Sequence, residues 1–179
     1  MRAHGCQLGA ALAALTLLIA HAPDARAGEE ELVVAPSLAY SVIRVDDKNR
    51  HGGAVYLDVD YGLTDSWSLR GTGLYAPHYV PGDDGGLLSV GGLGFGALYT
   101  FDVLKVVPFA SLTAGAVALG GAGQGLRWNA ALSVGVGLDY LVSRSFSVGF
   151  EVRYQLLVPD LKRYPFFLGV GIRLAWRRQ

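Results

Sequence analysis

Seven charged residues share one face of segments in which apolar residues alternate with small or polar ones. Carboxylates and guanidinium groups on one buried face can form a paired hydrogen-bonded network, or they can line a path for ions. An interior enclosed by eight strands has room for little besides side chains, so we expect a network that plugs it. The predicted network consists of Asp58, Asp60, Arg70, Asp139, Glu151, Arg153 and Arg173.

Two ion pairs within this network are predicted from hairpin geometry. A hairpin centred near residue 162 would place Glu151 opposite Arg173. The hairpin near the start of the chain would bring Asp58 or Asp60 to Arg70 in the same way. Each pair would neutralise charges that are costly to bury alone.

Nucleophilic catalysis is the second chemistry that the sequence could support. His51 and His78 fall in segments that we interpret as long loops, and Ser41 and Ser89 are the nearest serines at the rim. A lipid-modifying enzyme would need such a nucleophile and base in contact. Histidines in loops are usually solvated, so we predict no catalytic site and no enzyme.

Metal and cofactor chemistry have weaker signals. Asp83 and Asp84 lie between glycines but lack the spaced ligands of a calcium loop. The glycine-rich run 120–125 precedes no predicted helix, so it is not a phosphate-binding loop. Cys6 is the single cysteine, and it precedes the apolar run that begins the chain. We therefore expect no metal and no cofactor.

The elements that must position the charged face are strands, because the dominant period is two. Bulky Leu, Val, Phe, Tyr and Trp alternate with Gly, Ser, Ala, Asp and Arg. Most of the segments approach or exceed the 9–11 residues that cross a membrane as a tilted strand. The eight predicted strands are Leu32–Val45, Val55–Tyr61, Trp67–Tyr75, Leu88–Phe101, Val107–Ala118, Ala130–Tyr140, Phe146–Leu156 and Phe166–Trp176.

The connections between these strands alternate in length. Short turns are predicted at 63–66, 102–106 and 142–145, and longer connections rich in Gly, Pro and charge at 46–53, 77–86, 120–127 and 158–165. Short turns on one side and long loops on the other are typical of outer-membrane barrels. The sequence thus predicts an all-β fold, an eight-stranded antiparallel up-and-down transmembrane β-barrel.

Period two alone leaves the orientation of the faces open, because a soluble lipocalin-like barrel also alternates. The bulky face suits lipid and the small face suits a narrow lumen, so we expect Val136, Val148, Val152 and Val170 to face lipid. Charged residues make up 17% of the chain, below the roughly 25% of ordinary soluble domains. Aromatic residues near the strand ends predict two interfacial girdles. The girdle residues are Tyr61, Trp67, Tyr99, Tyr140, Phe146 and Trp176 beside the short turns, and Tyr75, Trp128 and Tyr164 beside the long loops.

The first 27 residues have the form of a signal peptide. Arg2 is followed by an apolar run from Leu8 to Ala20, and Ala25-Arg26-Ala27 is an A-x-A cleavage signal. The predicted domains are a signal peptide at 1–27 and a barrel at 28–179. Basic and acidic residues are equal at 15 each, which argues against nucleic acid as a partner.

The sequence resembles the outer-membrane protein β-barrel domain family, the small barrels related to the OmpA transmembrane domain. The resemblance rests on the leader, on the stretches 58–67 and 169–176, and on Pro108-Phe109 opening a strand. Family members often end on an aromatic residue read by the assembly machinery, whereas this chain continues for three residues after Trp176.

The resemblance implies an integral outer-membrane protein. We expect a structural or surface-interaction role, such as membrane integrity or adhesion, with a small pore or a lipid-modifying enzyme as alternatives. The expected partners are outer-membrane lipids, the barrel assembly machinery and surface partners that contact the long loops.

Overall fold

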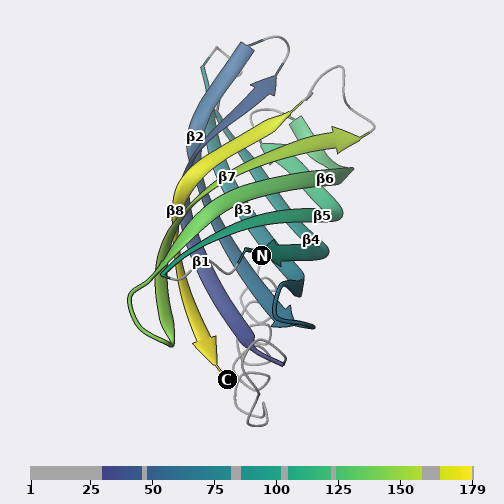
Figure 1. The fold of residues 1–179 in the computed structure, drawn as a ribbon. Helices are drawn as coiled ribbons and strands as arrows, with labels where there is room; N and C mark the ends of the chain where they lie inside the picture. The colour runs from purple at the N-terminus through teal and green to yellow at the C-terminus, as the bar shows by residue number, and fades with distance from the viewer. Residues whose placement is uncertain are drawn as a thin grey trace, which may run out of the picture.

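Eight antiparallel strands close into one barrel in the computed structural model, which describes residues 30–45, 48–81, 86–101, 105–121, 124–158 and 166–178. Neighbours in sequence are neighbours in the barrel, and β8 pairs with β1 to close it (Figure 1). The predicted fold class is confirmed. The strands are β1 (Leu32–Val45), β2 (Lys48–Gly62), β3 (Trp67–Val80), β4 (Gly86–Thr100), β5 (Val106–Gly121), β6 (Gln124–Leu141), β7 (Phe146–Val158) and β8 (Phe167–Arg178). The predicted signal peptide at 1–27 lies outside the described residues.

The short turns are built from local hydrogen bonds. At 63–66, the Thr64 hydroxyl oxygen accepts the backbone N–H groups of Ser66 at 3.3 Å and Trp67 at 3.0 Å. A threonine hydroxyl that binds backbone two or three residues ahead is a common way to start a turn. At 142–145, the N–H groups of Val142 and Ser143 both donate to the carbonyl of Phe146 at 3.0 Å. These turns lie at the lower end of the barrel in Figure 1.

Several strands extend further than predicted on the long-loop side. Residues 48–53 belong to β2, 76–80 to β3 and 119–121 to β5, and β6 begins at Gln124. Gly and Pro suggested loops there, but antiparallel pairing carries the strands past them. Pro77 does so at a local cost, because the β2–β3 ladder skips Ala76 and Pro77 while the β3–β4 ladder is continuous. Proline lacks an N–H and can therefore pair on one side only.

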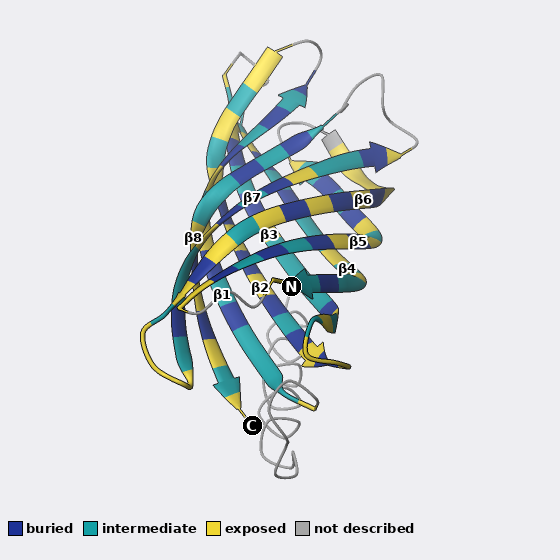
Figure 2. Ribbon diagram, viewed as in Figure 1, coloured by how far each residue is buried: buried dark blue, intermediate teal, exposed yellow. Residues whose placement is uncertain are grey.

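Buried and exposed residues alternate along the strands (Figure 2). The outward face is apolar: Val136 is 53% exposed and Leu93 is 75% exposed. So large an exposed apolar surface is stable in lipid and not in water. No helix within the described ranges is long and apolar enough to cross a membrane, a finding that concerns helical spans alone.

The inward face has two layers, and only one of them was predicted. The half toward the short turns holds the charged residues together with a few apolar side chains such as Phe109, whereas the half toward the long loops is occupied mainly by apolar side chains. We call this second layer the apolar plug, and every one of the eight strands contributes to it. The expectation of an inner face that is small or charged throughout is therefore wrong. The apolar plug consists of Ile43, Val45, Ala54, Tyr56, Ala76, Leu88, Val90, Val117, Leu119, Ala131, Leu157 and Phe167.

Candidate functional site: the barrel interior

Asp60 and Arg70 form the first ion pair of the interior. They lie directly opposite each other on β2 and β3, as the early hairpin predicted. Arg70 Nε donates to Asp60 Oδ1 at 2.7 Å and Nη2 donates to Oδ2 at 2.8 Å. Both residues are fully buried. This two-bond geometry is the strongest way for a guanidinium to hold a carboxylate.

Arg153 organises the second part of the network from β7. Its Nη2 donates to Asp58 Oδ2 at 2.8 Å and to Glu151 Oε1 at 2.7 Å, while Nη1 donates to Thr72 at 2.8 Å. Arg70 joins the two parts, because its Nη1 lies 3.4 Å from Glu151 Oε1. Glu151 thus contacts two guanidinium groups.

Arg173 completes the network from β8. It pairs with Asp139 and donates from Nη2 to Asp60 Oδ2 at 2.9 Å. The predicted Glu151–Arg173 pair is wrong, because the β7–β8 register aligns Glu151 with Gly171 and Arg173 with Gly149. A shift of two residues keeps both side chains inside but gives each a different partner. The structure brings all seven predicted charged residues into one connected network.

Two aromatic rings inside the barrel were not predicted. The Phe109 ring lies under both Arg70 and Arg173, with centroid distances of 5.6 Å and 5.1 Å to their guanidinium carbons. The centroid of the Tyr56 ring lies 4.3 Å from the guanidinium carbon of Arg153. Rings at this range stabilise cations through their π faces. Tyr56 lies two residues before Asp58 on the same strand, so its side chain points to the same inward face as Asp58 and Asp60. This spacing could have predicted its place inside the barrel.

Glycines make room for the network. Asp139 lies opposite Gly149, where an added Cβ would collide with Asp139 Oδ1. At Gly135, a Cβ would come within 2.8 Å of Glu151 Oε1. Each large charged side chain thus occupies space that a neighbouring strand leaves empty, as a narrow barrel requires.

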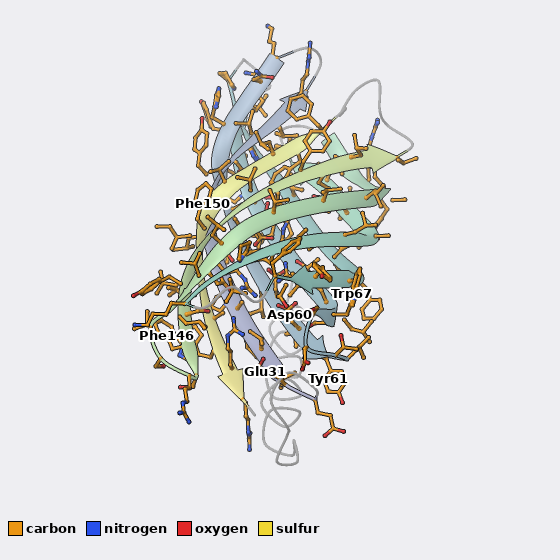
Figure 3. All side chains as sticks on the ribbon, viewed as in Figure 1. Glu31, Asp60, Tyr61, Trp67, Phe146 and Phe150 are labelled. Carbon is orange, nitrogen blue, oxygen red and sulfur yellow. The ribbon has the colours of Figure 1, made fainter. Side chains whose placement is uncertain are left out.

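Below the network, an open vestibule of about 280 Å³ faces the short-turn side. Its walls include Leu98, Val107 and Phe109, and its charged lining includes Asp60, Asp139, Arg173, Arg177, Asp65 and Glu31. Figure 3 shows Glu31 and Asp60 at this end of the barrel. Burial raises the pKa of Glu31, and the nearby Arg177 partly offsets this. Two smaller hollows beside Arg153 and Tyr56 measure about 20 and 10 Å³.

His51 and His78 lie in strands and not in loops, contrary to the prediction. His78 is fully buried on β3, and its Nε2 lies 3.0 Å from Ser41 Oγ. Its ring packs edge-on against Phe167 of the apolar plug, at 5.7 Å. His51 lies on the outer face of β2, where it hydrogen-bonds the Tyr40 hydroxyl. A serine and a histidine are therefore in contact, but both are fully buried in the half of the barrel that holds the apolar plug.

The predicted girdle residues beside the short turns project outward. Tyr61, Trp67 and Phe146 point away from the lumen near the lower rim in Figure 3. Trp67 packs edge-on against Tyr99 at 4.9 Å, and Phe146 contacts Trp176 at 5.1 Å. Tyr140 and Trp176 are also exposed.

The girdle on the long-loop side differs from its predicted position. Tyr75 and Trp128 are exposed, but they lie well inside β3 and β6 because those strands are longer than expected. Tyr164 lies outside the described residues. Tyr40 and Tyr79 are further exposed aromatic residues in this half of the barrel.

The barrel is similar in fold to solved structures of small outer-membrane proteins. Neisserial surface protein A matches with a TM-score of 0.62 and 16% identity, over 81% of this chain and 96% of that one. OprG, an outer membrane protein of Pseudomonas aeruginosa, matches with a TM-score of 0.58 and 12% identity, over 83% and 97%. The fold is that of a transmembrane outer-membrane β-barrel.

A third structure with this fold is Ail, the attachment invasion locus protein of Yersinia pestis, solved with the heparin analogue sucrose octasulfate. It gives a TM-score of 0.55 and 19% identity, over 84% of this chain and 99% of that one. No protein-family model matches the chain, and no curated protein matches its sequence. At these identities the likeness concerns the fold.

Proposed function

We propose that this protein is an integral outer-membrane barrel with a structural or surface-interaction role, and that its lumen is closed to ions. The observation that carries the proposal is the filled interior. Buried ion pairs occupy one half of the lumen, and an apolar plug contributed by all eight strands occupies the other. An ion would have to displace both layers in series.

The apolar plug is the stronger barrier of the two. A charged network can exchange partners with a passing ion, whereas an apolar constriction excludes the water that an ion needs. Leu88, Leu157 and Phe167 are at most 1% exposed. The long-loop half of the lumen is therefore packed like the core of a soluble protein.

A role at the cell surface is supported by the length of the barrel wall. The strands have 12 to 18 residues, more than the 9–11 that cross the hydrocarbon. On the long-loop side, β2 begins with the polar run Lys48 to His51, which suits water and headgroups better than acyl chains. Two barrels of this fold are named as a surface protein and an attachment invasion protein.

The first test is location and conductance. The protein should fractionate with outer membranes and show heat-modifiable gel mobility, as closed barrels do. In planar bilayers it should give no steady channels. A steady channel would favour the pore alternative, and recovery in the soluble periplasmic fraction would contradict the membrane assignment.

The Ser41–His78 contact keeps lipid hydrolysis as an alternative to be tested. Both residues are fully buried, so a substrate ester would have to pass the apolar plug to reach Ser41 Oγ. We therefore assign the contact a structural role. Purified protein in lipid vesicles should release no fatty acid, and release abolished by Ser41→Ala would overturn this assignment.

A further inference from the structure

The vestibule at the short-turn end of the barrel is a blind pocket. It has a volume of about 280 Å³, and the charged network and the apolar plug occupy the lumen beyond it. A molecule can therefore enter and leave it only from the short-turn side. Small-molecule pockets usually measure about 300–1,000 Å³, so this one suits a ligand of few heavy atoms.

Carboxylates outnumber guanidinium groups in the lining of the vestibule. Among the described residues, the acids of the lining are Glu31, Asp60, Asp65 and Asp139, and the bases are Arg173 and Arg177. Arg70, from the network above, pairs with Asp60. Three carboxylates then remain beside two guanidinium groups, so the vestibule has an excess of negative charge.

Asp139 has a buried oxygen that is available to a ligand. The residue is 2% exposed, and its Oδ2 contacts Arg173 and, at 3.9 Å, Arg177. Within the described ranges, its Oδ1 has no hydrogen-bond partner. This atom lies in the lumen over Gly149, where an added Cβ would collide with it. A buried carboxylate oxygen without a donor is costly, so a ligand that donates a hydrogen bond there gains stability.

The two arginines of the lining do not favour an anion. Arg173 Nε also lacks a partner, but the guanidinium group already binds Asp139 and, at 2.9 Å, Asp60. Arg177 is compensated in the same way by Glu31 at 3.7 Å. An anion placed beside either arginine would be repelled by these carboxylates. The charge of the vestibule therefore selects a cation.

One wall of the vestibule is apolar. Val107 lies directly opposite Asp139 in the β5–β6 ladder, and Leu98 of β4 and Leu141 of β6 line the same space. These three side chains come from adjacent strands. An ammonium group at Asp139 would therefore place a short hydrocarbon chain beside them, and each methylene group buried there adds affinity.

We propose that the vestibule binds a primary aliphatic amine as its ammonium ion. The ammonium group donates to Asp139 Oδ1, and the hydrocarbon chain lies against Val107, Leu98 and Leu141. Glu31 adds attraction for the ion at the same end. The inference goes beyond the closed-barrel proposal, because it assigns a ligand class to the end of the lumen that stays open.

Solution NMR of the protein in detergent micelles provides a local test near neutral pH, where alkylamines are protonated. The probe is butylammonium. Two control ligands keep its chain: 1-butanol has no charge, and 4-aminobutyrate adds a carboxylate at the far end. Butylammonium should shift the backbone amide resonances of Val107, Asp139 and Leu141 in a saturable way and leave that of Gly53, at the other end of the barrel, in place. 1-Butanol should bind at least about tenfold more weakly, because it lacks a charged donor for the carboxylate. 4-Aminobutyrate should also bind more weakly, because the lining repels its carboxylate.

Glu31→Gln and Glu30→Gln are matched variants, because they remove the same charge from adjacent residues. Glu31 lines the vestibule, whereas Glu30 is exposed and does not. Glu31→Gln should raise the Kd for butylammonium about two- to fivefold, and Glu30→Gln should leave it unchanged. Asp139→Asn should raise the Kd more than about tenfold, measured on protein that retains heat-modifiable mobility. If Asp139→Asn does not fold, the two glutamate variants still test the site.

Three outcomes would overturn the ammonium site. The first is that millimolar butylammonium causes no saturable shifts at the vestibule. The second is that 1-butanol or 4-aminobutyrate binds as tightly as butylammonium, which would show an apolar or zwitterion site. The third is that Glu30→Gln weakens binding as much as Glu31→Gln, which would show only a diffuse attraction for cations. None of these outcomes bears on conductance, so the closed-barrel proposal would stand or fall separately.

Discussion

Asp139 and Gly149 show how the interior is built one residue at a time. The carboxylate lies where a side chain on the opposite residue would stand. Gly149→Ala should therefore destabilise the barrel by about 1–3 kcal/mol, as overpacking does in tight interiors. Gly53→Ala is the matched control in another strand, because no atom lies within 4 Å of its added Cβ. Urea unfolding in detergent micelles or vesicles would compare them, and equal losses would argue against this account of the interior.

The ion pairs make a second prediction at the residue scale. Arg173→Met should cost about 3–5 kcal/mol, because it leaves Asp139 and Asp60 buried with fewer partners. The double variant with Asp139→Asn should recover part of this loss. A double-mutant cycle between Arg173 and Glu151 should show a smaller coupling energy than the cycle between Arg173 and Asp139. Arg173 and Glu151 share no direct hydrogen bond, and the charged network joins them through Asp60 and Arg70. The same unfolding assay measures both cycles, and stronger coupling to Glu151 than to Asp139 would contradict the observed register.

The identity of the interior residues could be predicted from sequence, but their partners could not. Side chains alternate between the two faces of a strand, so the spacing of residues within each strand decides which of them point inward. Glu151 and Arg173 therefore belong to the interior for any pairing of β7 with β8 that keeps this alternation. Pairing depends on the register across the connection between β7 and β8, and a shift of two residues leaves parity unchanged. The prediction that Asp58 or Asp60 would meet Arg70 left two partners open, and the four-residue turn between β2 and β3 sets the register that selects Asp60.

At the scale of elements, the outer face of a single strand should show the depth of the membrane. Val136 lies in β6 five residues before the end of the strand at Leu141, inside the short-turn girdle, and Leu126 lies near the start of β6 on the long-loop side; both are exposed. Val136→Arg should destabilise the barrel by about 2–4 kcal/mol, whereas Leu126→Arg should cost at most about 1 kcal/mol near the interface. Unfolding free energies in phospholipid vesicles would test this. Equal costs would mean that the hydrocarbon band does not cross β6 at Val136.

The number and order of strands follow from sequence, but their ends on the long-loop side do not. Pro77 and Gly120 suggested loops because such residues weaken strands, yet pairing with adjacent strands carries both into the barrel wall. The sequence does contain a signal for the apolar plug, although the alternation of apolar with small or polar residues draws attention away from it. Consecutive apolar residues occur at Leu156-Leu157-Val158 and at Phe166-Phe167, so both faces of these segments are apolar. Such runs are typical of strands that are buried on both faces.

At the scale of the whole molecule, the two layers of the lumen are barriers in series, and the higher barrier limits conduction. Network variants such as Arg70→Met should leave the barrel closed, because the apolar plug still excludes water. Trimming the plug alone, with Leu157→Ala and Phe167→Ala, should also leave it closed, because the ion pairs still fill the other half. Only the combination should produce steady current in planar bilayers, measured on protein that retains heat-modifiable mobility. Current from the network variant alone would show that the apolar plug does not seal the lumen by itself, and the account of two barriers in series would then fail even if the wild type is silent.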